Sequence, residues 1–188
     1  MKKNFVKFLA FSVLCLGFVS CGGDDDPIPD PDYDKSNITG EYEGSLKVVI
    51  GKVSLTYDKF RASFTPSASN TSILNVSLGD KITLDSVGLW VSDVQSSNFK
   101  NKGTYAAFSL SEIKANYKEG NVPKFISDQI NFIVKNVDMD LTTTGARYTI
   151  ATGVLTFEYT GSFTATGTEA GQSSSNTITY TFTLPRKK

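Results

Sequence analysis

The side chains available for chemistry limit what this protein can do. The chain of 188 residues contains no histidine and only two cysteines, Cys15 and Cys21. Histidine–serine triads and the usual zinc sites need imidazole or thiolate groups, so histidine-dependent mechanisms are excluded. Carboxylates, tyrosines, lysines and serines remain. This depletion favours binding over catalysis, and we expect no enzyme activity, no cofactor and no metal site.

Residues 1–20 have the anatomy of a secretory signal. Met1-Lys2-Lys3 gives a basic start, the stretch Phe5 to Val19 is mainly apolar, and Ser20-Cys21 closes the segment with small residues. The apolar run is interrupted by Lys7 and is shorter than the roughly 20 residues that span a bilayer. The pattern therefore predicts a signal peptide over residues 1–20 in preference to a permanent transmembrane helix.

Phe18-Val19-Ser20-Cys21 resembles the end of a bacterial lipoprotein signal. In that family the cysteine thiol is alkylated by diacylglycerol, the chain is cut before it, and the new amine is often acylated. The resemblance implies that Cys21 is the lipidation site and the first residue of the mature chain, which it would anchor to a membrane. Two or three acyl chains would hold durably, because each buried methylene adds about 0.8 kcal/mol. An ordinary export signal with a chance cysteine is the alternative.

Residues 21–35 are predicted to form a flexible acidic tether. Residues 22–34 contain six aspartates and three prolines, and such a composition does not fold alone. Cys-Gly-Gly-Asp-Asp-Asp, residues 21–26, also resembles the acidic export signal of surface lipoproteins of Bacteroidetes. This resemblance implies a protein that is lipid-anchored in the outer membrane and faces the cell exterior. A solvated linker with no export role is the alternative.

The charge of the remaining chain argues against nucleic-acid partners. Residues 35–188 carry 16 basic and 13 acidic side chains, a formal charge of +3. This excess is mild and dispersed, whereas nucleic-acid binding calls for a concentrated basic face. The sequence leaves the oligomeric state open.

Apolar and polar residues alternate with period two over residues 36–188, which predicts a single β-domain. The alternation is clearest in 153–167 and 176–184, where aromatic and aliphatic residues share one parity and threonines the other. A change of apolar parity after Asp58-Lys59 indicates a bulge or bend. Val122 to Asp128 is the only segment predicted to be helical. Further strands are predicted near residues 42–50, 53–64, 74–78, 82–91, 105–110, 113–117, 130–141 and 147–150.

Roughly ten strands predict an all-β fold, either an antiparallel barrel or a two-sheet sandwich. Ile38-Thr39-Gly40-Glu41-Tyr42-Glu43-Gly44 resembles the opening of calycin-like domains in lipoproteins of Bacteroidetes. Tyr42 stands where lipocalins have the tryptophan of their Gly-x-Trp motif. The resemblance implies an up-and-down barrel of about 8–10 strands that can enclose an apolar cavity. It also makes Tyr42 a candidate ligand-binding residue.

Paired carboxylates are the remaining chemistry. Glu41 and Glu43 lie two residues apart on a predicted strand, as do Asp138 and Asp140, so each pair shares a face at about 7 Å. This separation suits an inverting glycosidase, but it is also typical of a solvated strand face. The stretch from residue 30 to 41 has the spacing of a calcium loop. A lysine occupies the position where that loop needs glycine. We assign neither a catalytic nor a metal role.

Trp90 is the only tryptophan and has the opposite parity to Val87, Leu89 and Val91. We therefore predict that it lies on the wet face, where an indole can stack on a sugar, and name it a candidate ligand-binding residue. A tryptophan that covers the core is the alternative. Asp85-Ser86-Val87 also resembles the three-residue acceptor for O-glycosylation in Bacteroidetes, a motif short enough to arise by chance.

Together these patterns predict a non-enzymatic surface lipoprotein of the outer membrane whose β-domain binds a glycan, a lipid or a partner protein. A structural or adhesive role in the envelope is the alternative, and a carboxylate-dependent hydrolase is the third reading. A deep cavity in the domain would favour binding over scaffolding.

Overall fold

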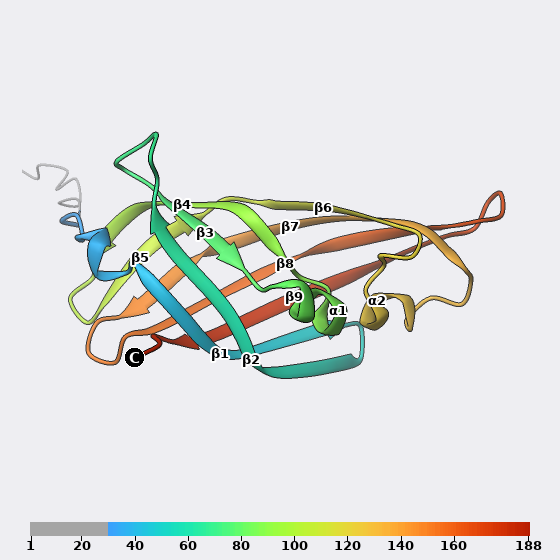
Figure 1. Ribbon diagram of the computed structural model, residues 1–188, viewed down its shortest axis with the longest axis horizontal. Coiled ribbons are helices and arrows are strands. Elements are labelled where there is room, and N and C mark those ends of the chain that lie inside the picture. Colours follow the sequence, from blue (N-terminus) through green and yellow to red (C-terminus); the bar gives the residue numbers. More distant parts are fainter. Residues whose placement is uncertain (1–29) are drawn as a thin grey trace, which may run out of the picture.

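The computed structural model describes residues 30–188, which form a β-barrel (Figure 1). The predicted signal peptide, Cys21 and the first part of the tether lie outside the described residues. The elements are η1 (Lys35–Asn37), β1 (Gly40–Ile50), β2 (Val53–Pro66), β3 (Leu74–Leu78), α1 (Lys81–Val87), β4 (Val91–Asn101), β5 (Tyr105–Leu110), β6 (Ile113–Lys118), α2 (Lys124–Ser127), β7 (Val134–Thr149), β8 (Val154–Gly167) and β9 (Ser173–Pro185).

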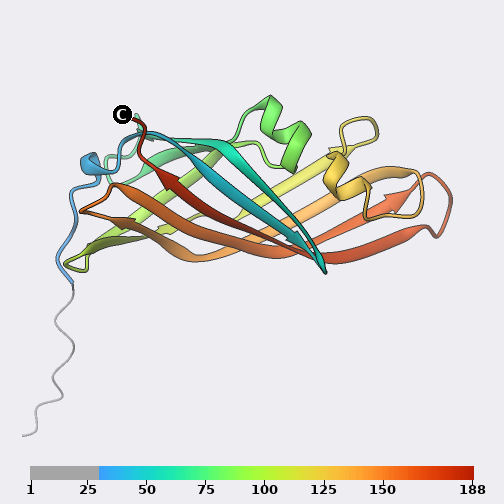
Figure 2. The ribbon, with the colours of Figure 1, turned by 90° about the horizontal axis from the view of Figure 1, so that it is seen from below.

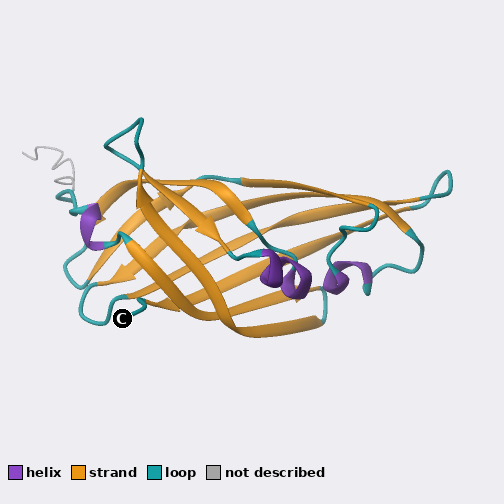
Figure 3. Cartoon of the chain, in the orientation of Figure 1, coloured by secondary structure: helices purple, strands orange, loops and turns teal. Residues whose placement is uncertain are grey.

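Eight antiparallel strands close the barrel, and β6 is an additional strand. Chain neighbours pair from β1 to β5 and from β7 to β9, while β1 pairs with β9 and β5 with β7. This connectivity is that of an up-and-down barrel, and such closure removes the exposed edges of a sheet. The barrel implied by the calycin resemblance is therefore confirmed, and the two-sheet sandwich is wrong. Figure 3 shows how strands dominate the structure.

Strands β5 and β6 behave as one strand that is broken at residues 111–112. Both pair with β7 in the same register, so that Tyr105 lies opposite Thr149 and Ile113 opposite Leu141. The carbonyl of Ser111, at the break, accepts a hydrogen bond of 2.7 Å from the Tyr159 hydroxyl. Beyond this point β6 to β9 continue as an extension of the barrel wall, which ends in the long β8–β9 hairpin (Figure 1).

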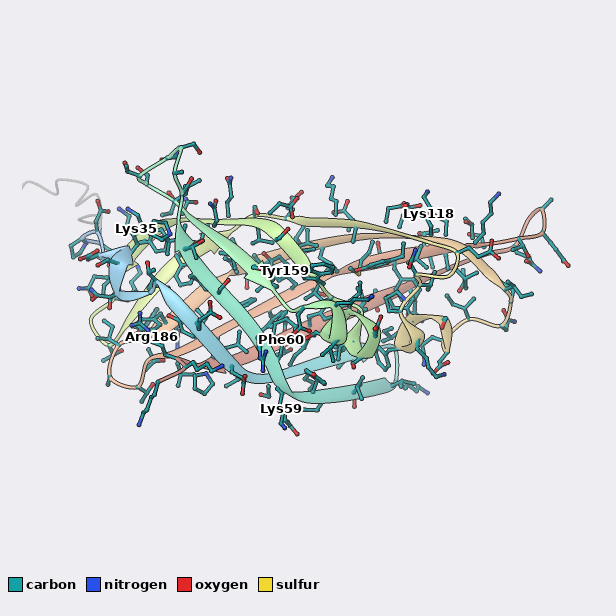
Figure 4. The ribbon with its side chains drawn as sticks, viewed as in Figure 1. Lys35, Lys59, Phe60, Lys118, Tyr159 and Arg186 are labelled. Atoms are coloured by element: carbon teal, nitrogen blue, oxygen red, sulfur yellow. The ribbon has the colours of Figure 1, made fainter. Side chains whose placement is uncertain are left out.

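Side chains fill the interior of the barrel. The parity predicted for β8 and β9 is confirmed, because every apolar residue from Leu155 to Ala165 and from Ile178 to Leu184 on that parity is buried. Phe157 and Phe182 stack at 4.2 Å between ring centroids, and Phe60 meets Phe182 edge-on at 5.2 Å. Phe60 and Tyr159, which are labelled in Figure 4, are fully buried in this interior. Aromatic packing of this kind supplies a large share of a core's stability.

A bulge in β2 explains the parity change that the sequence contains. Gly44 lies opposite Phe60 but Leu46 lies opposite Tyr57, so β2 has one residue more than β1 over this interval. The extra residue falls at Asp58-Lys59, where a bulge was predicted. The bulge consequently lets residues of both parities face the same core, Phe60 and Phe64 on one side of it and Leu55 and Tyr57 on the other.

The strand predicted over residues 82–91 is wrong, because residues 81–87 form helix α1. Asp80 begins the helix, and its carboxylate accepts from the Thr83 backbone N–H at 2.8 Å and from the Thr83 hydroxyl at 2.9 Å. Gly88 ends it in the left-handed conformation, with φ of 76°. These caps decide the structure, since apolar residues at 84 and 87 fit either a strand or a short helix. Residues 30–188 thus contain two short α-helices besides the 3-10 helix η1, instead of at most one short helix.

Strand β7 also differs from its prediction. The segments expected at 130–141 and 147–150 are parts of one strand that begins at Val134 and runs through a bulge between Thr143 and Ala146. Gly145, with φ of 118°, lies in this bulge. The helical turn predicted at Val122 to Asp128 is confirmed by α2.

Residues 30–34, expected to belong to the flexible tether, lie along β4. We call this segment the strap. The Tyr33 N–H donates to the Phe99 carbonyl at 3.0 Å, and the Asn101 N–H donates to the Pro31 carbonyl at 2.8 Å. Asp32 forms an ion pair with Lys100 at 2.5 Å, and Asp30 pairs with Lys102. The described fold therefore starts at the strap, ahead of the predicted boundary at residue 36.

Candidate functional site

Two chain excursions meet at one side of the barrel and form a groove. One links β3 to β4 and contains α1, and the other links β6 to β7 and contains α2. We call residues 79–90 and 119–133 together the cap. Figures 1 and 2 show α1 and α2 side by side, away from the end at which the strap and the C-terminus lie.

Gly88 allows the two excursions to approach closely. A Cβ atom at this position would lie 2.9 Å from the Cβ of Pro123, which is closer than carbon atoms pack. Its positive φ adds a second reason for glycine. The Tyr117 hydroxyl, on β6, donates a hydrogen bond of 2.8 Å to the Gly88 carbonyl. The end of α1 is thus fixed against both β6 and the start of α2.

Trp90 follows this fixed point and lies at the surface. Leu89 is fully buried, while 48% of Trp90 is exposed, in agreement with the predicted wet face. The indole forms part of a groove of about 560 Å³ between the two halves of the cap. The groove is lined by Lys81, Leu84, Asp85, Trp90, Gly120, Asn121, Val122, Pro123 and Lys124.

The groove combines an aromatic face with groups that bind hydroxyls. Leu84 and Val122 are partly buried and supply apolar contact beside the indole. Asp85 can accept hydrogen bonds, and Asn121 can both donate and accept them. Lys124 is held at 2.6 Å from Asp128, so its ammonium is positioned at one side. A mainly apolar surface with a few polar groups is typical of a small-ligand site.

Tyr42, the other predicted ligand-binding residue, lies elsewhere. It is 1% exposed, and its hydroxyl donates to the Ile38 carbonyl at 2.6 Å. Its ring meets Phe64 edge-on at 5.5 Å, and burial raises the pKa of the phenol. Tyr42 is a core residue near the start of β1 and does not line the Trp90 groove.

The paired carboxylates lie on solvated strand faces. Glu43 pairs with Arg61 at 3.0 Å and with Lys187 at 3.8 Å. Asp140 lies 3.6 Å from Lys114, and Asp138 accepts hydrogen bonds from two neighbouring asparagines. A glycosidase acid needs a carboxyl that is kept protonated by an apolar pocket. Glu43 and Asp140 are paired with cations and Asp138 accepts from amides at an exposed strand face, so these carboxyls do not have such surroundings.

The described residues contain neither a metal centre nor a membrane span. Within residues 30–188, no group of three metal-ligating side chains is placed to hold an ion. The helices among the same residues are too short and too polar to cross a bilayer. Ser86, in the predicted glycosylation motif, donates its hydroxyl to the Ile82 carbonyl of α1 at 3.0 Å.

Comparison with known proteins gave no match: no protein-family model, no curated protein and no solved structure is similar to this chain. The class is therefore defined by the fold itself. The protein is an all-β up-and-down barrel of eight closed strands with one extra strand. Its interior is filled with side chains, and the Trp90 groove lies on its outer surface.

Proposed function

We propose that this protein is a non-enzymatic surface lipoprotein of the outer membrane that binds a glycan in the Trp90 groove. The observation that carries the proposal is the half-exposed indole between hydrogen-bonding side chains. A sugar ring has an apolar face that stacks on an aromatic side chain and hydroxyls that need polar partners. Trp90 supplies the first, and Asp85 and Asn121 supply the second.

The filled interior favours a glycan over a lipid. A lipocalin-like site holds its ligand inside the barrel, but here Phe60, Phe157 and Phe182 pack against one another at the centre. An acyl chain would have to displace these rings, whose burial stabilises the fold. The exposed groove demands no such change, because its aromatic residue already faces solvent.

The fluorescence of Trp90 gives a direct test, because the chain has a single tryptophan. Purified protein is titrated with a panel of soluble neutral polysaccharides and oligosaccharides. Stacking removes the indole from water, so we expect a blue shift of emission on binding. In affinity gel electrophoresis Trp90→Ala should weaken binding at least about tenfold, as expected for a central aromatic contact. Trp90→Phe should retain part of the affinity.

A matched control is Ile133→Ala, which removes another exposed apolar side chain, 71% exposed, away from the groove lining. Its affinity should equal that of the unmodified protein. Glycan binding that survives Trp90→Ala, or that leaves the emission unchanged, would mean that the groove is not the site.

The anchor and its orientation are tested separately, because Cys21 and the aspartates at 24–26 lie outside the described residues. Mass spectrometry of the mature N-terminus should find a lipid-modified Cys21, and Cys21→Ala should release the protein from membranes. Protease treatment of intact cells should remove the domain. Replacement of Asp24, Asp25 and Asp26 with alanine should prevent that removal, and equal cleavage would reduce the acidic run to a linker.

A further inference from the structure

A row of residues crosses the outer face of the barrel at the end opposite to the cap. Lys100 of β4 lies opposite Ala107 of β5, and Ala107 lies opposite Arg147 of β7. Adjacent strands are about 4.8 Å apart, so the two cationic residues leave the backbone roughly 10 Å from each other. The small side chain of Ala107 between them leaves a gap that is flanked by positive charge on both sides.

This gap is the centre of an open cleft of about 390 Å³. The bottom of the cleft is lined by residues with little or no side chain, Ala107 and, in the bulge of β7, Gly145. Tyr105 lines one side of the cleft. The Arg147 guanidinium lies 3.9 Å from the centroid of the Tyr105 ring. Stacking on an aromatic ring orients a guanidinium while leaving its N–H groups free to donate to an anion.

Carboxylates of the strap already bind the lysines beside this cleft. Asp32 pairs with Lys100 at 2.5 Å, and Asp30 pairs with Lys102. Hydrogen bonding to the Lys100 ammonium lowers the pKa of Asp32, so this carboxyl is ionised at neutral pH. Both acids approach from the β4 edge that faces away from β5. Within residues 30–188, no carboxylate lies within ion-pair distance of Arg147.

We propose that this cleft binds a polysaccharide that carries carboxylates, such as a polymer of uronic acids, with one carboxylate held between Lys100 and Arg147. Asp30 and Asp32 are then internal competitors that share the lysines with the ligand. Contacts to exposed ammonium groups are weak one at a time, so the open cleft suits a polymer whose repeated charges engage Lys100, Lys102 and Arg147 together. The site does not depend on the Trp90 groove.

The test uses the purified full chain and affinity gel electrophoresis with polygalacturonate, with dextran as the uncharged polymer. In Trp90→Ala, which removes the proposed contact to neutral glycans, we expect retardation by polygalacturonate only, and weaker retardation as salt rises, because salt screens exposed charges. Arg147→Gln should weaken binding about tenfold, since it removes the bidentate donor. Lys100→Gln should weaken it less. Lys118→Gln, an exposed lysine at the far end of β6 (Figure 4), is the matched control and should have no effect.

The double variant Asp30→Asn/Asp32→Asn separates competition from general charge effects. Removing internal competitors should tighten polygalacturonate binding about threefold, beyond the change given by neutralising two other exposed aspartates in Asp58→Asn/Asp93→Asn. Weaker binding in the double variant, or equal binding in Arg147→Gln, would overturn the proposal. So would binding to vesicles with phosphatidylglycerol but not to polygalacturonate, which would indicate a membrane-facing surface. Trp90→Ala should leave this binding intact, so that failure of one site is distinguishable from failure of the other.

Discussion

Two regions of the molecule differ in what they bury: the barrel wall formed by β8 and β9, and the cap. In the wall, over residues 155–165 and 178–184, the inward positions are mostly apolar side chains, and threonines predominate on the outside. In the cap only a few side chains are buried, among them Val87, Leu89 and Ile126, while Trp90 and Ile82 face solvent. The wall therefore supplies much of the buried core, whereas the cap leaves side chains such as Trp90 exposed to solvent. The buried core and the proposed binding groove therefore lie in different parts of the same barrel.

The largest expected loss of stability comes from a substitution in the core of the wall. Phe182 is fully buried and contacts the rings of Phe60, Phe157 and Tyr159. Phe182→Ala removes these contacts and leaves a cavity, so it should lower the free energy of unfolding by about 3–5 kcal/mol. Urea unfolding of the purified protein measures this change.

Thr179→Ala is the control on the opposite face of the same strand. Its hydroxyl lies at 3.1 Å from that of Thr160 in an exposed pair, so the cost should be roughly 1 kcal/mol or less. Equal destabilisation by the two substitutions would mean that the outer face contributes to stability as much as the core does.

A smaller effect is expected from Gly88→Ala in the cap. The new Cβ would require a left-handed alanine and would also press on Pro123, so we expect a loss of about 2–3 kcal/mol and a shifted Trp90 emission. Gly103→Ala is the matched control. Gly103 has a similar φ of 79° but open space around it, so it should cost only about 1–2 kcal/mol. Equal losses would show that contact with Pro123 contributes nothing.

Alkaline pH should weaken the link between β6 and the cap, which is made by the Tyr117 hydroxyl and the Gly88 carbonyl. Burial raises the pKa of Tyr117 to about 12, above its ordinary value of 10.0. The stability from the neutral phenol is thus complete below pH 10 and is lost as the pH rises towards 12, by up to about 2 kcal/mol. Unfolding measured between pH 9 and 12 should show this loss. Burial also raises the pKa of Tyr42, Tyr159 and Tyr180, so Tyr117→Phe should make the slope shallower without removing it and, at neutral pH, cost about 1 kcal/mol for the bond to Gly88.

The smallest effect concerns the start of α1. Asp80→Ala removes the cap of the helix and should cost about 1 kcal/mol. Hydrogen bonding to Thr83 lowers the pKa of Asp80, so its contribution is present above pH 3.8 and is lost as the pH falls through the lowered value. The difference in stability between Asp80→Ala and the unmodified protein should therefore shrink in acid. A difference that is constant with pH would exclude the ionised carboxylate as the cap.

The contrast between wall and cap also decides what could be predicted from the sequence. In β8 and β9 one parity is almost wholly apolar, so both the strands and their buried faces could be predicted. In residues 79–90 the apolar spacing fits strand and helix alike, and only the caps, Asp80 with Thr83 and then Gly88, distinguish them. Tyr42 shares its parity with Leu46 and Val48, and this parity correctly indicates a core residue. The resemblance to calycin-like domains had suggested a ligand-binding residue instead.

The exposure of Trp90 was predicted correctly, although the parity behind it assumed a strand where residues 81–87 form α1, and the groove could not be predicted. Its two sides come from residues 81–90 and 120–124, which meet only because the closed barrel brings the β3–β4 and β6–β7 connections together. The sequence contains only a weak indication that the strap pairs with β4. Its aspartates are spaced two residues apart, as are Lys100 and Lys102, but nothing local indicates that an acidic stretch will pair with a strand so distant in sequence.

The strap also has a mechanical consequence. Tension that enters the chain from its N-terminal side reaches the strap before it reaches β1, which is hydrogen-bonded to β2 on one edge and to β9 on the other. The strap's two backbone hydrogen bonds to β4 and its two exposed ion pairs would therefore open first. Each freed residue would add about 3.3 Å of slack. Since the partners stay in one chain, these contacts would form again when the load is removed. The hydrogen bonds of the barrel itself would meanwhile remain intact.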